Sequence, residues 1–198
     1  MQQKNLWQVT SKEKITFSYL KKSITTDLVV IGGGFTGCSA ALSAAKNGLS
    51  VTLVDKKIGY GGSGRNVGLV NAGLWMPPEK VESILGLDAG VKLNKALATA
   101  PDLVFSLIDN YEINCSANRS GTLHCAHSKK GLKDIHLRFK QLSERGAELE
   151  LLDKQQTQER IGSSKFFGSL FNKKAGIINP LDYCLGLARV AKSYGVNI

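Results

Sequence analysis

Long apolar runs are missing from this chain of 198 residues. A helix that crosses a membrane needs about 20 consecutive apolar residues, and no stretch approaches that length. The N-terminus also lacks the apolar core of a secretory signal peptide, because Lys4, Lys12, Glu13 and Lys14 interrupt it. We therefore expect a cytoplasmic protein without a transmembrane segment.

Paired cysteines are also missing. The four cysteines form no CxxC pair and no repeated spacing; they are Cys38, Cys115, Cys125 and Cys184. This pattern supports neither a disulfide framework nor a zinc ribbon, so we expect reduced thiols. Cys38 follows a glycine turn, where a small side chain is wanted, and we interpret it as a packing residue.

A cluster of residues that could bind one metal ion is missing as well. His124, Cys125 and His127 lie close together, but an alternating strand would place His124 on the face opposite to the other two. We therefore predict no metal site.

Acidic residues are few, and the formal net charge is +10. Residues 1–25 contain five lysines and one acid, and residues 129–174 contain eleven basic and six acidic residues. The lysines are scattered, and residues 129–174 form no continuous basic stripe with interleaved aromatic residues. We expect a solvated basic surface and no specific nucleic-acid partner, although non-specific affinity for anions stays open.

A glycine turn between two apolar segments is the most informative feature present. Leu28–Ile31 is apolar throughout, as in a parallel strand covered on both faces. Gly32, Gly34 and Gly37 follow at once. In such a turn the first glycine allows the bend, the second lets a pyrophosphate approach the backbone, and the third lets the helix pack on the strand.

The residues after this turn complete a βαβ unit. We predict a helix from about Phe35 to Asn47, closed by Gly48, and a strand over residues 50–54. Asp55 follows that strand, where a carboxylate accepts hydrogen bonds from ribose hydroxyls. The pattern favours a dinucleotide site. The alternative is an ordinary βαβ unit whose glycines serve packing alone.

A second glycine-rich stretch comes directly after Asp55. Residues 56–68 read KKIGYGGSGRNVG, with five glycines in thirteen residues. Each glycine inside a helix costs up to about 1 kcal/mol relative to alanine, so we predict a loop. Its backbone N–H groups would lie beside the first turn and face an anion. A long cofactor lying across the sheet edge needs a second contact surface of this kind.

Together, GGGFTGCSAALSAAKNGLSVTLVD and GYGGSGRNVG resemble the N-terminal part of FAD-dependent oxidoreductases of the D-amino-acid oxidase and glycine oxidase class. The group it is most similar to is the bacterial amine and amino-acid oxidoreductases with an SGRN motif. The resemblance implies FAD as cofactor and an α/β fold: an incomplete Rossmann-like FAD-binding βαβ domain of the glutathione-reductase type, with part of an α+β substrate domain.

The same resemblance assigns roles to individual residues. Gly32, Gly34 and Gly37 would cradle the pyrophosphate, with Phe35 and Thr36 between them. Asp55 would bind the adenosine ribose, and Lys56 would lie near the adenine. The pyrophosphate and the path to the flavin would be lined by Gly62, Ser63, Gly64, Arg65 and Asn66. No catalytic residue is implied.

Four residues leave alternatives open. Members of the class more often carry glutamate where this chain has Asp55, which leaves NAD more open as the cofactor. Lys56 and Lys57 could indicate NADP, but Asp55 would repel the 2′-phosphate. Arg65 could be a surface cation that caps a carbonyl.

The remaining sequence predicts alternating helices and strands. We expect a helix from Pro77 and Pro78 to Leu85, a longer one capped by Asp88 to about Asn110 and bent or restarted at Pro101, a strand at 122–127, a helix at 129–145 ending at Gly146, a strand at 148–152, a helix capped by Asp153 to Ile161, a strand at 166–171 and a helix from Pro180 to Gly195.

The domain organisation follows from these elements and from the resemblance. We expect an N-terminal extension at 1–25, a first FAD-domain segment at 26–80, a helical and substrate-domain segment at 81–175, and a return to the FAD domain at 176–198. Residues 196–198 look like the start of a strand, so we expect a truncated chain that supplies about half of a family member.

Three functions remain in competition. The first is the N-terminal half of an FAD-dependent oxidoreductase that oxidises the C–N bond of an amine or amino acid by hydride transfer to flavin. The second is an NAD-dependent dehydrogenase. The third is a non-catalytic fragment that binds nucleotide or pairs with a complementary chain. An exposed sheet edge would then favour a complementary C-terminal half or homo-association.

Overall fold

The computed structural model of the chain describes residues 5–198. These residues form two compact units. Unit 1 comprises the chain up to Gly68, Ser106–Ala117 and Ile178–Ile198, and unit 2 comprises Leu69–Phe105 and Asn118–Ile177. The division of the chain into domain segments at 1–25, 26–80, 81–175 and 176–198 stays a prediction.

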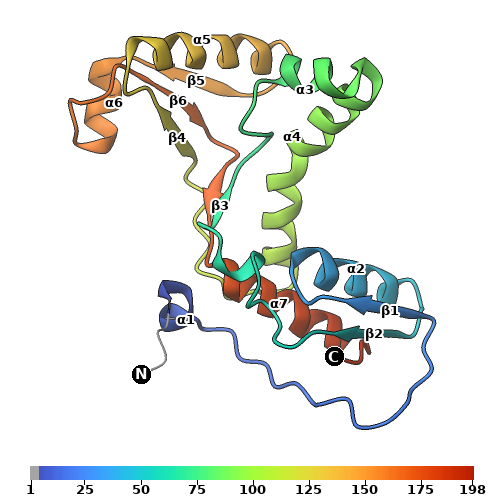
Figure 1. Cartoon of the computed structure of the whole chain (residues 1–198). Helices are drawn as coiled ribbons and strands as arrows, with labels where there is room; N and C mark the ends of the chain where they lie inside the picture. The colour runs from blue at the N-terminus through green and yellow to red at the C-terminus, as the bar shows by residue number, and fades with distance from the viewer. Residues whose placement is uncertain (1–4) are drawn as a thin grey trace. The chain divides into compact units, whose positions relative to one another are not determined.

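Unit 1 contains the predicted βαβ unit. Strand β1 (Leu28–Ile31) runs parallel to β2 (Val51–Val54), with Leu28 opposite Val51 and Ile31 opposite Val54. Helix α2 (Phe35–Lys46) connects the two strands and is followed by Gly48, whose φ of 85° fits a helix C-terminus. Figure 1 shows α2 beside this pair of strands. This part of the sequence prediction is confirmed.

Helix α7 (Pro180–Ser193) supplies much of the core of unit 1. Asn179 caps it by accepting the N–H groups of Leu181 and Asp182. The chain then turns at Gly195, and Asn197 pairs in parallel with Thr52 on β2. The predicted strand start at residues 196–198 is therefore present, although it forms only a single bridge.

Strand β1 differs from its prediction. We expected cover on both faces, but Val29 is 55% exposed and Ile31 is 87% exposed. Their neighbours Leu28 and Val30 are half-buried, so burial alternates along the strand. The apolar run thus identifies the strand correctly, but no part of residues 5–198 covers its second face.

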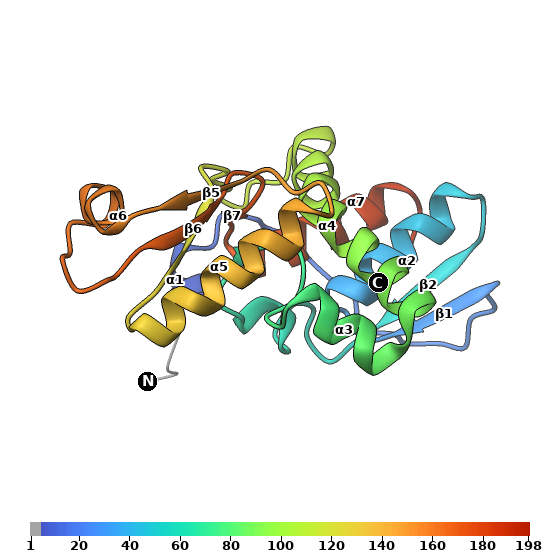
Figure 2. The ribbon, with the colours of Figure 1, turned by 90° about the horizontal axis from the view of Figure 1, so that it is seen from above.

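Unit 2 is built on an antiparallel sheet in the order β4–β6–β5 (Thr122–Cys125, Ser169–Asn172 and Leu149–Leu152). Helix α5 (Lys129–Ser143) packs on this sheet; Figure 2 shows it alongside β5 and β6. The buried core is Ala126, Ile135 and Leu170, with partly buried neighbours Leu132, Phe139, Leu149 and Leu151. This sheet and helix agree with the α+β expectation.

The other elements of unit 2 are shorter or lie around this sheet. They are β3 (Leu69–Val70), which pairs with β7 (Gly176–Ile177), together with α3 (Pro78–Leu85), α4 (Leu87–Asn110, whose last residues belong to unit 1) and α6 (Lys154–Ile161). Asp153 caps α6 in a capping box with Gln156, as predicted. Among the helices described between residues 5 and 198, none combines the length and apolarity that a membrane span requires.

Four sequence expectations need correction. Helix α4 begins at Leu87, so Asp88 lies in its first turn and is not its cap. The helix also continues through Pro101 without restarting. Strand β6 covers Ser169–Asn172 instead of residues 166–171. The short elements α1 (Leu6–Thr10), β3 and β7 were not predicted, because segments of two to five residues carry too little periodicity.

The core of unit 2 gives a stability prediction. Ile135 is 1% exposed and packs under the sheet, so Ile135→Ala should lower the free energy of unfolding by about 3 kcal/mol. Leu137 lies on the same helix but is 48% exposed, and Leu137→Ala should cost less than about 1 kcal/mol. Urea unfolding followed by circular dichroism measures both. Equal losses would mean that the assigned core face is wrong.

Candidate functional site

The first glycine turn has the geometry that its sequence predicts. Gly32 adopts φ +108°, a conformation that residues with a Cβ rarely adopt. A Cβ on Gly37 would collide with the carbonyl oxygen of Gly32, so only glycine lets α2 approach the end of β1 this closely. Gly34 begins the helix and offers no side-chain cap of its own. The N-terminal end of α2 is therefore open to an acceptor from elsewhere.

Ser63 brings the second glycine loop to this helix end. Its Oγ accepts the N–H of Phe35 at 3.0 Å, and a Cβ on Gly34 would lie 2.7 Å from the same oxygen. Ser63 begins a single 3₁₀ turn, η1 (Ser63–Arg65), inside the loop. A hydroxyl oxygen thus binds where a phosphate oxygen would bind, at a helix N-terminus.

The loop is also joined to the first turn through its backbone. The N–H of Gly59 donates to the carbonyl oxygen of Gly33 at 2.9 Å. A Cβ on Gly64 would collide with the carbonyl oxygen of Gly59, which explains why this buried position is a glycine. The predicted arrangement, a loop lying beside the first turn, is therefore the one observed.

Asp55 closes the site at the end of β2. Its carboxylate accepts the N–H of Lys57 at 2.9 Å and the N–H of Gly33 at 2.6 Å. These backbone hydrogen bonds hold the pKa of the Asp55 carboxyl below its ordinary value, so the group is ionised at neutral pH. An exposed carboxylate at this position has oxygen lone pairs left for ribose hydroxyls.

The remaining predicted residues are all exposed, and two of them make hydrogen bonds within the second loop. The Asn66 side chain closes the loop on itself, because its Nδ2 donates to Ser63 and its Oδ1 accepts the N–H of Gly68. The Arg65 Nε donates to the carbonyl oxygen of Gly61 at 3.3 Å, the capping contact that the sequence left open as an alternative. The exposed residues of the set are Thr36, Lys56, Gly62, Arg65 and Asn66.

Sequence reasoning missed the residues that lock this site together. Gly33 is the donor to Asp55 and the acceptor for Gly59, although only its neighbours Gly32 and Gly34 fit the motif. From α7, Leu181 lies 3.0 Å from the place where a Cβ of Gly59 would be. The Tyr183 ring meets the Phe35 ring edge-on at 5.3 Å. The run of three glycines at residues 32–34 was a sequence signal that could have indicated Gly33. No sequence signal indicated the contacts that Leu181 and Tyr183 of α7 make with the site.

The buried thiols near the turn are structural. Cys184 Sγ donates to the carbonyl oxygen of Gly33 at 3.3 Å. Its hydrogen bond with Cys38, together with burial, raises the pKa of the Cys184 thiol above its ordinary value. A protonated thiol is a poor nucleophile, so we interpret Cys184 as a residue that packs the turn.

Unit 2 contains a separate cavity of about 680 Å³ between α3, α4, α5 and β5. Three of its charged lining residues are held in ion pairs: Arg145 with Glu82 at 2.7 Å, and Arg138 with Asp134 at 2.8 Å. The features that suit a pyrophosphate and a ribose all lie in unit 1. We therefore take the two glycine loops and Asp55 as the candidate site.

Comparison with protein families agrees with this geometry. The family described as DAO, FAD dependent oxidoreductase, matches residues 27–198. That match includes both glycine loops, Asp55 and α7, and it begins after the N-terminal segment.

Comparison with curated proteins gives relatives along most of the chain. It is 31% identical to gamma-glutamylputrescine oxidoreductase of Escherichia coli (strain K12) over 90% of this chain and 42% of that protein. It is 29% identical to the probable oxidoreductase OrdL of Rhizobium meliloti (strain 1021) over 97% of this chain and 45% of that protein. The chain thus spans less than half the length of these relatives.

Solved structures show the same fold. Glycine oxidase from Geobacillus kaustophilus aligns with a TM-score of 0.70 at 21% identity, covering 86% of this chain and 45% of that one. L-amino acid deaminase from Proteus vulgaris aligns with a TM-score of 0.76 at 18% identity, covering 93% of this chain and 41% of that one. At these identities the likeness establishes the fold, as part of a larger domain.

Proposed function

Because the chain belongs to the DAO family of FAD-dependent oxidoreductases, we propose that unit 1 holds the ADP portion of FAD. The observation that carries this proposal is the junction of the two glycine loops at the N-terminus of α2, where Ser63 Oγ accepts the N–H of Phe35. The glycines support the fit to a pyrophosphate: Gly37 lets α2 approach β1 closely, and a Cβ on Gly34 would crowd Ser63 at the helix N-terminus.

Each predicted residue then has a role in binding. The turn at Gly32, Gly34 and Gly37, with Phe35 and Thr36, would contact the pyrophosphate. Asp55 would accept the ribose hydroxyls, and Lys56 would lie near the adenine. The second loop would line the path to the flavin through Gly62, Ser63, Gly64, Arg65 and Asn66. The exposed Arg65 guanidinium is free to turn toward a phosphate, since its partner in the structure is only a carbonyl.

We further propose that the protein takes part in the oxidation of the C–N bond of an amine or amino acid. Bound flavin supplies the hydride acceptor for this chemistry. The names of the relatives support the substrate class: an oxidoreductase for gamma-glutamylputrescine, a glycine oxidase and an L-amino acid deaminase. Unit 1 would be the cofactor-binding part and unit 2 part of the substrate domain.

Titration with cofactors tests this proposal. On addition of FAD to the purified chain, we expect quenching of flavin fluorescence and a protein-bound flavin spectrum after gel filtration. NAD⁺ at the same concentration should bind more weakly, because the second loop suits the longer cofactor. A chain that binds NAD⁺ and leaves FAD free would contradict the proposal and favour a nicotinamide-dependent dehydrogenase. A chain that binds neither would favour a non-catalytic fragment.

The partner and the location are further parts of the proposal. The exposed apolar side chains Val29 and Ile31 on β1 favour pairing with a complementary C-terminal half or with a second copy. Sedimentation velocity would measure this, and a strictly monomeric chain at high concentration would exclude self-association.

We place the protein in the cytoplasm, since its cysteines have the unpaired pattern of reduced thiols. Fractionation of cells that express a tagged chain would test this location.

A further inference from the structure

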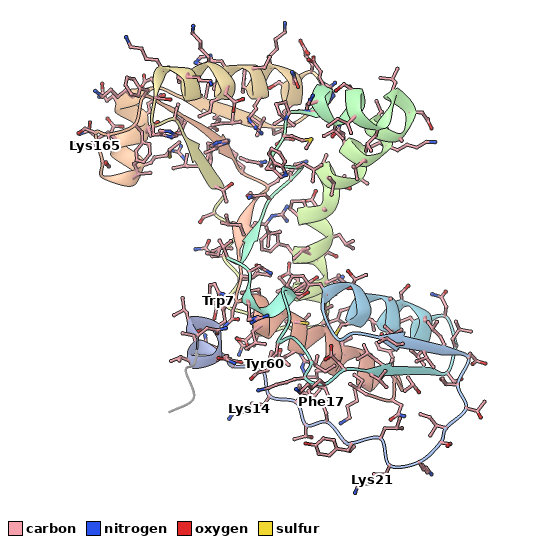
Figure 3. All side chains as sticks on the ribbon, viewed as in Figure 1. Trp7, Lys14, Phe17, Lys21, Tyr60 and Lys165 are labelled. Carbon is pink, nitrogen blue, oxygen red and sulfur yellow. The ribbon has the colours of Figure 1, made fainter. Side chains whose placement is uncertain are left out.

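The N-terminal strap, residues 5–16, lies outside the part of the chain that the family match covers, which begins at residue 27. It consists of helix α1 and the extended residues after it. Figure 3 shows Trp7 and Lys14 along this segment, with Phe17 just after it, on the side of unit 1 that carries α7. The strap has no place in the proposed cofactor contacts, yet it makes several long-range hydrogen bonds.

Its principal anchor is a buried carboxylate. Asp182 in the first turn of α7 is 0% exposed. Its oxygens accept the hydroxyl of Ser11 and the backbone N–H groups of Lys12, at 3.0 Å, and Glu13, at 3.1 Å. A buried carboxylate without such donors would be strongly destabilising, so this residue depends on the strap being in place.

Other residues of α7 hold the same strap. The Asn179 Nδ2 donates to the carbonyl oxygen of Trp7 at 3.3 Å. Nearly three turns farther along the helix, Arg189 pairs with Glu13 through contacts of 2.9 and 3.0 Å. Lys192 donates to the carbonyl oxygen of Thr16 at 2.9 Å. One helix thus fixes the strap along most of its length.

The same first turn of α7 also contacts the candidate cofactor site. Leu181 lies against Gly59 and Gly64 of the second glycine loop, and Cys184 Sγ donates to Gly33 in the first turn. Asp182, between these two residues in sequence, holds the strap. The first turn of α7 therefore joins the strap to both glycine loops.

A second connection bypasses α7. The indole Nε1–H of Trp7 donates to the carbonyl oxygen of Asn66 at 2.8 Å. Asn66 is the last residue of the SGRN stretch, and its side chain already closes that turn on Ser63 and Gly68. The strap therefore fixes the backbone of the second loop directly.

We propose that the strap is a positioning element for the second glycine loop, with Trp7 on the strap and Asp182 on α7 as the two positioning residues. This inference rests on the proposed function, since the loop is taken to contact FAD. The strap holds Asn66 and the first turn of α7, so the second loop is already ordered before FAD binds. FAD binding then loses less conformational entropy, and the affinity for FAD is higher.

The test uses Trp7→Phe, which keeps an aromatic ring but removes the indole N–H. Its control is Tyr19→Phe, a change three residues beyond the strap at a residue that is 92% exposed. Asp182→Asn removes the charge and keeps the size, and its control is Asp88→Asn on the exposed surface of unit 2. All four are compared with the unaltered chain in FAD titrations and in hydrogen exchange of residues 59–66 without FAD.

Trp7→Phe should weaken FAD binding about five-fold, the effect of losing about one hydrogen bond, with a melting temperature close to that of the unaltered chain. Asp182→Asn should weaken it about ten-fold or more. Both should speed hydrogen exchange in residues 59–66 and change the visible circular dichroism of bound flavin, whereas the controls should not.

The outcomes separate this inference from the proposed function. Unchanged FAD affinity and unchanged exchange in both strap variants would overturn the inference while leaving the cofactor assignment in place. If the unaltered chain binds no FAD, the proposed function fails; faster exchange at 59–66 in the variants would still support the strap, and unchanged exchange would overturn it. If Asp182→Asn does not fold, the Trp7→Phe results decide.

Discussion

Replacing Gly37 by valine should abolish FAD binding, with a loss of at least about 100-fold in affinity. A Cβ at this position collides with the carbonyl oxygen of Gly32. The Cβ is bonded directly to the backbone of α2, and the oxygen is part of the backbone that follows β1. Neither atom can therefore move unless α2 is displaced from β1. Such overpacking costs about 3 kcal/mol of stability and misplaces the N–H groups that face the pyrophosphate. FAD titration and thermal unfolding of the variant measure the two effects.

Gly61→Ala is the matched control, because a Cβ on Gly61 meets nothing within 4 Å and its φ lies outside the left-handed region. It should bind FAD like the unaltered chain. If Gly37→Val does not fold, Gly34→Ala tests the same site: its Cβ would meet the Ser63 side chain, with Oγ at 2.7 Å and Cβ at 3.5 Å, and the hydroxyl can rotate away. Unimpaired FAD binding by folded Gly34→Ala and Gly37→Val would contradict the cradle.

Asp55→Ala should weaken FAD binding by about 100-fold. The change removes the charged acceptor proposed for the ribose hydroxyls, and hydrogen bonds to a charged group contribute about 1.5–3 kcal/mol each. It also releases the N–H groups of Gly33 and Lys57, which the carboxylate accepts in the structure. Titration with FAD measures the loss.

Asp55→Glu is the conservative control, since it keeps the charge and lengthens the side chain by one methylene. It should retain affinity within about ten-fold. If Asp55→Ala bound FAD as well as Asp55→Glu does, the carboxylate would have no part in binding.

The pH dependence of the Asp55 contribution has a definite sign. The folded-state pKa is lowered by the N–H groups of Lys57 and Gly33. Stability from these hydrogen bonds is therefore fully present above the ordinary carboxyl pKa of about 3.9 and is lost as the pH falls through the lower folded value. The stability difference between the unaltered chain and Asp55→Asn should be constant from about pH 5 to 8 and shrink below about pH 4. Acid unfolding curves of the two proteins measure it.

The elements that the sequence predicts well are those with a strong local signal. The run Leu28–Ile31, the glycines after it and the cap Asp153 each determine structure through their immediate neighbours. The exposure of Val29 and Ile31 was not predictable, because an apolar run carries no information on what covers it. Helix α4 passes Pro101 without a break because tertiary packing of this buried residue outweighs the lost hydrogen bond.

The candidate site was predictable where it follows a motif and hidden where it depends on contacts between distant segments. The glycine spacing indicates Gly34 and Gly37, and the strand end indicates Asp55. The contact between Trp7 and Asn66 joins residues far apart in sequence, as does the contact between Ser11 and Asp182. Neither Trp7 nor Asp182 belongs to a motif, so only the folded chain brings them to the site.

Hydrogen exchange with and without FAD tests the central claim most directly. If the two glycine loops jointly hold the ADP portion of FAD, added FAD should slow exchange at residues 32–37 and at residues 59–66 together, and NAD⁺ at equal concentration should protect the second stretch less. Protection of the first stretch alone, or equal protection of both by NAD⁺, would contradict the account.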